Sequence, residues 1–504
     1  MIQHNHEQQK QRKKVDILLI FPPLRTWDRP RNFPCGLGLI ASILREAGYA
    51  VGVIDVNGLR WDNQQVIDEI KTYDTKVIGI GGMISTYRWV KTMTHLIGKT
   101  MPQDVKIILG GSVGTSIIQT AFDKLKIDVM TIAEADETIL QLLPAMLENK
   151  PLKDIRGIAY LDENGRLVKT PARPQIEDLD TLPYPAWDLF PMKTYLENPI
   201  VGVGKDIDVI SSRGCPYPCQ YCYRIFGRNY RGRTADNVIG EVKILVEEYG
   251  IDFISFQDDC FVIDKKRVFD ICDKIDAAGW NLKWSCTGRV NVCDKPLLER
   301  MRASGCVSVS YGLESGSNAI LKRMKKNTTT EKAAQTIEMT RDAGIRAPVS
   351  FMIGYPGETR ETVMETVALC KRLNIPLTAL MITCPYPGTP LYDEFKDSKQ
   401  MLARYGVSDG LQIKLDEEAF VLDIGDAVDL AVNLSDMPDE ELLAVRQEAL
   451  DMAAKNYIPP SAEEVAAQEL DLYGEKLYKK AKIQLASPEL KAHRKRHGFN
   501  SKMG

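Results

Sequence analysis

Two stretches of the chain alternate short apolar runs with amphipathic segments, and this rhythm limits the possible folds more than any other feature. In the first stretch, patterns with helical spacing separate five apolar runs of strand length. These runs are 15–21, 51–55, 77–80, 105–109 and 128–132. Continuous apolar strands that alternate with helices are typical of a parallel sheet covered on both faces. Residues 15–150 are therefore predicted to form a doubly wound, flavodoxin-like α/β domain, with its ligand beyond the carboxyl ends of the strands.

The second stretch, residues 201–398, repeats the same rhythm six times. Its candidate strands are 208–211, 252–256, 283–287, 307–312, 346–353 and 378–383. Six strand–helix units predict a (β/α)6 partial TIM barrel, in which the functional residues gather at the carboxyl ends of the strands.

The segments outside these two arrays have other patterns. Residues 1–14 form a polar tail, and residues 151–200 are predicted to be a connector that contains Asn164-Gly165, a strong hairpin turn signal. Residues 399–504 are predicted to be a mostly helical C-terminal region with a basic end at 491–502.

The most specific motif is a loop after the first barrel strand, with Cys215, Cys219 and Cys222 inside eight residues. A structural zinc site needs a fourth ligand, but the next cysteine, Cys260, lies 38 residues on and all five histidines are remote. Iron–sulfur clusters normally take four cysteines, so three predict a cube with one iron left open. A zinc or redox loop is the alternative interpretation.

Composition limits the compartment and the partners. Eleven cysteines cannot all pair, and the polar start has no apolar signal, so a reduced, cytoplasmic chain is expected. No uncharged apolar run approaches the ~20 residues that span a bilayer, so no transmembrane segment is expected. With 65 basic and 68 acidic residues there is no broad cationic field, and no nucleic-acid partner is expected.

The CxxxCxxC spacing, with an aromatic residue before its last cysteine, resembles the radical S-adenosylmethionine (SAM) superfamily. The doubly wound domain in front of the barrel is similar to the B12-binding branch, and PYPGTPLY at 385–392 is similar to that family's barrel end. The resemblance covers residues 15–398 and is closest to the class B methyltransferases. It implies a [4Fe–4S] cluster on the three cysteines, SAM, cobalamin, a small-molecule or peptide substrate, and an electron donor such as flavodoxin or ferredoxin.

The resemblance also implies which barrel residues hold SAM. Tyr221 stands at the aromatic position near the adenine, and Arg289 suits a bidentate pair with the SAM carboxylate. Asp258 stands where the family places the group that holds the amino end, although no GGE motif is present here. Glu314 fits a ligand of the ribose or the amino group, and Gly354 ends the fifth strand. For each of them, a satisfied turn at the barrel rim is the alternative interpretation.

Glycines and hydroxyl side chains at the strand ends of the first domain suit a corrin, because glycine lets the backbone approach a large flat ring. The candidate residues are Ser85, Thr86, Gly110, Gly111, Ser112 and Thr115. The DxHxxG loop that supplies a cobalt ligand in many cobalamin proteins is absent. The loop at 22–29 has no histidine, and His95 falls within a helix. We therefore expect cobalamin without a histidine on cobalt, which favours the nucleophilic cob(I)alamin used in methyl transfer.

The resemblance implies an enzyme that cleaves SAM reductively to a 5′-deoxyadenosyl radical and methylates an unactivated carbon through methylcobalamin. Two alternatives stay open: a radical SAM cyclase or rearrangement enzyme without methyl transfer, and a non-catalytic iron–sulfur or corrinoid sensor. The basic run KRMKK at 322–326 is typical of a solvated helix end, with an anionic substrate as the alternative partner.

Overall fold

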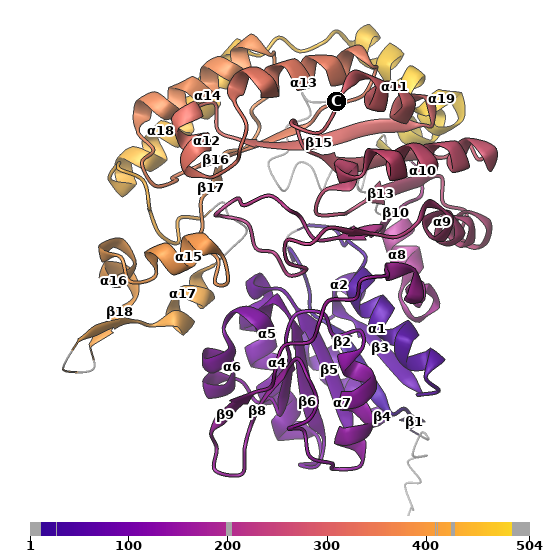
Figure 1. The fold of residues 1–504 in the computed structure, drawn as a ribbon, viewed down its shortest axis with the longest axis vertical. Coiled ribbons are helices and arrows are strands. Elements are labelled where there is room, and N and C mark those ends of the chain that lie inside the picture. Colours follow the sequence, from indigo (N-terminus) through magenta and orange to yellow (C-terminus); the bar gives the residue numbers. More distant parts are fainter. Residues whose placement is uncertain are drawn as a thin grey trace, which may run out of the picture. The chain divides into compact units, whose positions relative to one another are not determined.

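The computed structural model describes residues 12–26, 28–197, 204–408, 410, 412–424 and 429–485. Most of the predicted polar tail, and the basic end at 491–502 with His493 and His497, lie outside these residues. The chain divides into two compact units (Figure 1). Unit 1 comprises Met1–Pro30, Pro34–Gln175 and Leu182–Thr194, and unit 2 comprises Arg31–Phe33, Ile176–Thr181 and Tyr195–Gly504.

Unit 1 is built on a seven-stranded sheet whose parallel part has the order β3-β2-β5-β6-β7, the flavodoxin-like order. The strands are β2 Ile17–Phe21, β3 Val51–Asp55, β5 Val77–Gly82, β6 Lys106–Gly111 and β7 Val129–Thr131. The main helices are α1 Cys35–Glu46, α3 Asn63–Ile70, α4 Tyr87–Thr100, α6 Ile118–Lys124 and α7 Thr138–Leu147. The predicted doubly wound fold is confirmed, because each of these strands overlaps a predicted run and helices separate the strands along the chain.

The hairpin predicted around Asn164-Gly165 forms, but it extends the sheet of unit 1 rather than acting as a free connector. β8 Ile158–Leu161 pairs antiparallel with β7, and β9 Leu167–Lys169 pairs with β8. Gly165 has the positive φ that such a turn needs. A local turn signal specifies the hairpin but not the distant strand beside which it lies, so the sequence pattern left this pairing out.

Unit 2 contains an open parallel sheet with the order β10-β13-β14-β15-β16-β17. The strands are β10 Asp206–Val209, β13 Phe253–Phe256, β14 Lys283–Gly288, β15 Cys306–Glu314, β16 Val349–Ile353 and β17 Met381–Ile382. The main helices between them are α9 Ala235–Tyr249, α10 Lys265–Ala277, α11 Lys295–Ala303, α13 Thr330–Asp342 and α14 Arg360–Arg372. β10 and β17 do not pair with each other, so the barrel is partial, as predicted.

The inner face of this half-barrel is hydrophilic. Asp208, Ser255, Ser285 and Ser308 lie opposite one another in register across four strands, and the Ser255 and Ser285 hydroxyl oxygens are 3.3 Å apart. The interior of a closed TIM barrel is ordinarily packed with branched apolar side chains. Here hydrogen-bonding groups replace them, which suits a face that binds a polar ligand.

The region after the barrel is mostly helical, as predicted. α15 Pro390–Phe395 lies within the predicted barrel range, and the helices after it are α16 Lys399–Tyr405, α17 Glu417–Asp423, α18 Asp439–Asn456 and α19 Ala462–Leu485. The sequence pattern did not predict the hairpin of β18 Gly406–Ser408 and β19 Ile413–Leu415. Among the described residues, no helix combines the length and the apolar character that a membrane crossing requires.

Candidate active site

The cysteine loop follows the carboxyl end of β10, and a two-stranded ladder closes its base. β11 Ser212–Arg213 pairs antiparallel with β12 Arg231–Gly232. Gly214 starts the loop with φ of +85°, and a Cβ at this position would lie 2.2 Å from the Asn229 carbonyl oxygen. Only glycine permits so close an approach. Cys215, Cys219 and Cys222 therefore lie in a loop whose two ends are held together.

Asp258, directly after β13, anchors the start of this loop. Its carboxylate accepts hydrogen bonds from the Ser211 backbone N–H, the Ser211 hydroxyl and the Ser212 hydroxyl, each at 2.6 Å. Asp258 is buried, and both of its carboxylate oxygens are used in these contacts. The residue predicted to hold the SAM amino group thus supports the segment that leads to the cluster cysteines.

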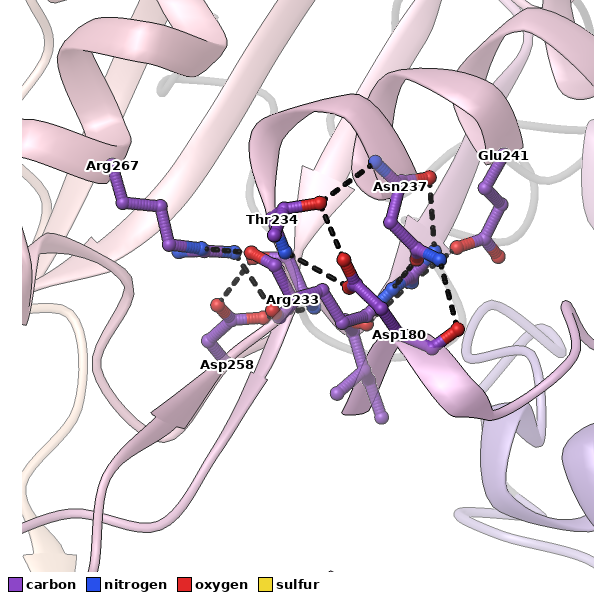
Figure 2. A network of polar contacts seen from close by, with 9 residues as sticks. Asp180, Arg233, Thr234, Asn237, Glu241, Asp258 and Arg267 are labelled. Carbon is purple, nitrogen blue, oxygen red and sulfur yellow. Dashed lines mark hydrogen bonds and ion pairs between the residues drawn. The ribbon is translucent and has the colours of Figure 1, made fainter. Parts of the chain in front are cut away.

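Further polar contacts fix the other end of the loop (Figure 2). Arg267 of α10 donates to the carbonyl oxygens of Ser211 at 2.7 Å and Arg233 at 2.6 Å. Arg233 forms an ion pair with Glu241, whose pKa is raised by complete burial although Arg233 opposes the shift. The Thr234 backbone N–H donates to Asp180 at 2.9 Å at the start of α9. The base of the loop is therefore rigidly supported.

The three thiols differ in exposure: Cys219 is buried, Cys215 half-buried and Cys222 exposed. Surrounding protein nevertheless shields the Cys222 sulfur enough to raise its pKa to about 11, with Cys219 and Cys215 as further causes. Within the described residues, no three His, Cys, Asp or Glu side chains converge as ligands of a single ion do. Each iron of a cube takes its own thiolate, so cluster ligands need not converge on one ion. Three neighbouring soft donors fit such a cube.

Arg289, directly after β14, lies against the cysteine loop. Its guanidinium stacks on Tyr217, 3.6 Å from the ring centroid, and its Nη1 is 3.7 Å from the Cys219 Sγ. Its Nη2 donates to the Lys326 carbonyl oxygen. Its Nε is buried, with no hydrogen-bond partner among the described residues. Buried N–H groups are rarely left unpaired, so this one suits an anionic ligand such as a carboxylate.

Glu314, at the end of β15, belongs to a buried polar triad. Its Oε1 accepts hydrogen bonds from the Lys326 Nζ at 2.8 Å and from the Tyr221 hydroxyl at 3.1 Å, and the same Nζ donates to the Tyr221 oxygen at 2.9 Å. Glu314 has φ of +69°, which is uncommon for a residue with a Cβ and is frequent at functional sites. Burial, and then Glu314, raise the pKa of Tyr221, which keeps this hydroxyl protonated.

Lys326 is a site residue that the sequence analysis missed. The expectation of a solvated helix end over 322–326 is wrong for Lys326, which is buried, and correct for Lys322, Arg323 and Lys325, which are exposed. A run of like charges gives no indication of which member turns inward. The left-handed φ of Lys325, +52°, accompanies this reversal, and nothing in the composition of the run predicts it.

Gly354 follows β16 with φ of +85°, and its turn is closed by a buried carboxylate. Glu358 accepts hydrogen bonds from the N–H groups of Gly354 at 2.5 Å and Tyr355 at 3.3 Å. Burial raises the pKa of Glu358 to about 7. The Tyr355 ring meets that of Tyr221 edge-on, with 6.5 Å between centroids. The turn at Gly354 thus supports the aromatic residue of the cysteine loop.

In unit 1, glycines of β5 and β6 lie side by side at the carboxyl edge. Gly81 pairs with Gly110, and Gly82 pairs with Gly111. Gly111 has φ of +83°, and a Cβ there would lie 2.2 Å from the Gly82 carbonyl oxygen. Bare backbone at this edge suits the close approach of a flat macrocycle.

The hydroxyl candidates of unit 1 have different surroundings. The Ser112 Oγ accepts the Ile84 N–H at 3.0 Å, and the Thr86 hydroxyl donates to the Met83 carbonyl oxygen at 2.7 Å. Ser85 is exposed, whereas Thr86 is buried. Thr86 therefore braces its own turn, and Ser85 is the more accessible of the two.

No histidine reaches this edge from the two places where one was sought. His95 lies in the third turn of α4, about 12 Å along the helix from its start at the carboxyl edge, with its Nδ1 2.8 Å from the Lys91 carbonyl oxygen. In the loop after β2, Arg60 donates to the carbonyl oxygens of Leu24 at 2.6 Å and Asp28 at 3.0 Å. The Arg60 guanidinium thus holds two described carbonyl groups of this loop.

Comparison with known proteins identifies both units. A B12 binding domain model matches residues 31–143, and a radical SAM superfamily model matches residues 209–370. The fold and the two sites therefore define a radical SAM enzyme with a B12 binding domain, and SAM and cobalamin, the cofactors that these two family models name, are those predicted.

Relatives with curated names show to which family of radical SAM enzymes the chain belongs. An uncharacterized methyltransferase of Pyrococcus horikoshii is 34% identical over 76% of this chain and 83% of its own length. The cytidylyl-2-hydroxyethylphosphonate methyltransferase of Streptomyces wedmorensis is 25% identical, covering 79% and 86%. The anaerobic magnesium-protoporphyrin IX monomethyl ester cyclase of Rubrivivax gelatinosus is 28% identical, covering 73% and 67%. The chain belongs to the cobalamin-dependent radical SAM methyltransferase family, which has cyclases among its relatives.

Solved structures share the fold. The methyltransferase TsrM from Kitasatospora setae, with cobalamin and a [4Fe–4S] cluster bound, matches with a TM-score of 0.68 at 18% identity, over 94% of this chain and 99% of that one. OxsB, a cobalamin-dependent SAM radical enzyme with aqua-cobalamin bound, matches with a TM-score of 0.64 at 19% identity, over 76% and 56%.

Proposed function

We propose that this enzyme methylates an unactivated carbon of a small-molecule or peptide substrate. Two features together carry the proposal. Unit 2 has a loop with three thiols at the carboxyl edge of its open barrel, and unit 1 has a glycine edge on β5 and β6 that no described histidine approaches. When bound, the cluster supplies the electron that cleaves SAM, and cobalamin carries the methyl group.

The residues of the chain take distinct roles in this proposal. Cys215, Cys219 and Cys222 hold three irons, and the Arg289 Nε binds the SAM carboxylate. Tyr221, held by Glu314 and Lys326, lies against the adenine, and Glu314 binds the ribose or the amino group. Asp258 is a positioning residue because its oxygens are already bonded to Ser211 and Ser212. In unit 1, Gly110, Gly111, Ser112 and Ser85 contact the corrin.

Two features of the chain support the location and the partners that we propose for this reaction. None of the eleven cysteines, all of which are described residues, forms a disulfide, which supports a reducing, cytoplasmic location. The near balance of charge supports a reaction without a nucleic-acid partner. The electron comes from a protein donor such as flavodoxin or ferredoxin.

The experiment uses the anaerobically reconstituted holoenzyme, SAM with a deuterated methyl group, and a small-molecule extract of the source cells. We expect equal amounts of S-adenosylhomocysteine and 5′-deoxyadenosine, together with a deuterium-labelled product. The C215A/C219A/C222A variant is the matched control, which should lose iron and the formation of 5′-deoxyadenosine.

One outcome would contradict methyl transfer, and another would contradict the assignment of the cluster site. Release of 5′-deoxyadenosine with an unlabelled product indicates cyclisation or rearrangement, and the Rubrivivax relative is named as a cyclase. If the triple variant keeps its iron and its SAM cleavage, the cysteine loop is not the cluster site.

A further inference from the structure

The segment from Lys322 to Asn327 presents two different faces. Lys322 and Arg323 end α12 Asn318–Arg323, and Lys325 follows; all three side chains are exposed. Lys326, by contrast, is buried in the triad with Glu314 and Tyr221. The outer face of this segment is therefore cationic, while its inner face belongs to the active site.

The inner face contacts the two residues that directly follow Cys219 in the cysteine loop. The Gln220 N–H donates to the Met324 carbonyl oxygen at 3.1 Å, and the Lys326 Nζ donates to the Tyr221 hydroxyl oxygen at 2.9 Å. The Lys326 carbonyl oxygen accepts a hydrogen bond from Arg289, which also lies 3.7 Å from the Cys219 Sγ. Only the backbone of this short segment thus separates the exposed cations from the cysteine loop.

The outer face forms a small basic pocket. Its volume is about 490 Å³, and it is lined by Ala319, Ile320, Lys322, Arg323, Lys325 and Gly357. No carboxylate of the described residues lies within 4.0 Å of the three cationic groups, although many other exposed cations of this unit are paired, as Lys266 is with Asp270. Cations suit a helix C-terminus, but that preference applies only to Lys322 and Arg323 and not to Lys325 beyond the helix.

We propose that Lys322, Arg323 and Lys325 form the docking surface for an acidic one-electron carrier protein that reduces the cluster. The proposal extends the proposed function, since it names the surface through which the electron enters. Redox encounters use small interfaces, and an uncompensated cationic patch steers an acidic partner and raises its association rate by 10–10³ at low salt. One electron leaves the reduced carrier and enters the oxidised cluster, so the carrier is oxidised by one electron and the cluster is reduced by one.

The test compares two reductants of the reconstituted holoenzyme: an acidic flavodoxin in its hydroquinone form, and dithionite, a small reductant that needs no docking surface. The K322E/K325E variant should be reduced by flavodoxin at least tenfold more slowly than wild type at low ionic strength. Its reduction by dithionite should stay within twofold of wild type. High salt should bring the wild-type rate with flavodoxin close to that of the variant.

The matched control is K99E/K371E, which makes the same change in net charge at two exposed residues that do not line the pocket. Lys99 lies in unit 1, and Lys371 is near the end of α14, roughly 16 Å along the helix from its start at the carboxyl edge of the barrel. This control should be reduced at the wild-type rate by both reductants. If charge reversal reduces the iron content, K322Q/K325Q replaces it, with an expected threefold or greater loss with flavodoxin alone.

Equal rates of flavodoxin reduction in wild type and in the pocket variant, at full iron content, overturn the docking surface. An equal loss in the pocket variant and in K99E/K371E overturns it as well, because net charge then accounts for the effect. Cluster reduction is followed spectroscopically without SAM. A failure of the proposed methyl transfer is therefore distinguishable from a failure of docking, because the cluster is then reduced by flavodoxin while the assay with deuterated SAM gives no labelled product.

Discussion

At the scale of single residues, glycines that the sequence does not distinguish have different surroundings in the structure. Gly111 and Gly165 both have positive φ, but a Cβ on Gly111 would meet the Gly82 carbonyl oxygen at 2.2 Å, whereas nothing lies within 4 Å of one on Gly165. The sequence could mark both as turn or strand-end glycines. It could not show which of them has another strand against it, because that depends on the pairing of β5 with β6.

Replacement of these glycines by alanine separates backbone strain from steric conflict. G165A should cost about 1 kcal/mol, the penalty for a side chain at positive φ. G111A should cost more than about 2 kcal/mol, because the backbone of two strands must also move apart. Thermal unfolding of both variants measures the difference, and cobalamin retention should fall for G111A alone. Equal losses of stability would argue against the close contact.

The buried triad gives a second residue-level prediction. K326M leaves the Glu314 carboxylate buried without its cationic partner, and breaking such a pair costs about 3–5 kcal/mol. The E314Q/K326M double variant should recover part of this loss, because no uncompensated charge remains. Urea midpoints of the apoprotein check both values. A K326M variant within about 1 kcal/mol of wild type would show that the triad contributes little to stability.

At the scale of elements, strands and helices were predictable and their pairing was only partly so. Apolar runs such as 15–21 and 77–80 predicted β2 and β5, since buried parallel strands need such runs. The cysteine spacing predicted the cluster loop, whereas the roles of Lys326 and Asp258 arise from contacts with residues far away in sequence. The pairing of β8 with β7, likewise, has no local signature.

The turn after β16 predicts a pH dependence of stability. Burial raises the pKa of Glu358 to about 7, above the 4.5 of an unperturbed glutamate. Between these values the folded chain holds a proton that the unfolded chain has lost, so stability falls as pH rises from about 4.5 to about 7. The total effect is up to about 3 kcal/mol. The unfolding midpoint should change less with pH across this range in E358Q than in wild type. Parallel curves of midpoint against pH would contradict the raised pKa of Glu358.

At the scale of the whole molecule, unit 1 is assembled from separated parts of the chain. Leu182–Thr194 belongs to it, and within it the Ala186 N–H donates to the Gly38 carbonyl oxygen at 2.9 Å while Arg45 pairs with Asp188 at 2.7 Å. Ile155, Ile158 and Ala186 are buried in its core cluster. A boundary drawn at residue 150 from the sequence rhythm therefore leaves out part of this core.

Truncated chains test this composition of unit 1. A chain of residues 12–150 lacks three buried core residues and the strands β8 and β9, so it should unfold at least 10 °C below a chain of residues 12–197, because each buried apolar side chain contributes about 1.5–3 kcal/mol. Circular dichroism on heating measures both chains, and cobalamin retention after gel filtration should favour the longer one. Equal melting temperatures would show that the added segments are dispensable.

The interleaving of the units has a consequence for biosynthesis. Arg31–Phe33 belongs to unit 2, where the Asn32 side chain donates to Asp208 at 3.2 Å, although in the sequence it lies between β2 and β3 of unit 1. On the ribosome, Arg31–Phe33 cannot make this contact until residue 208 has emerged, by which point β2, β3, β5, β6 and β7 of unit 1 have already emerged. We therefore expect the sheet of unit 1 to assemble before Arg31–Phe33 is fixed, which limited proteolysis of pulse-labelled ribosome-bound chains can test.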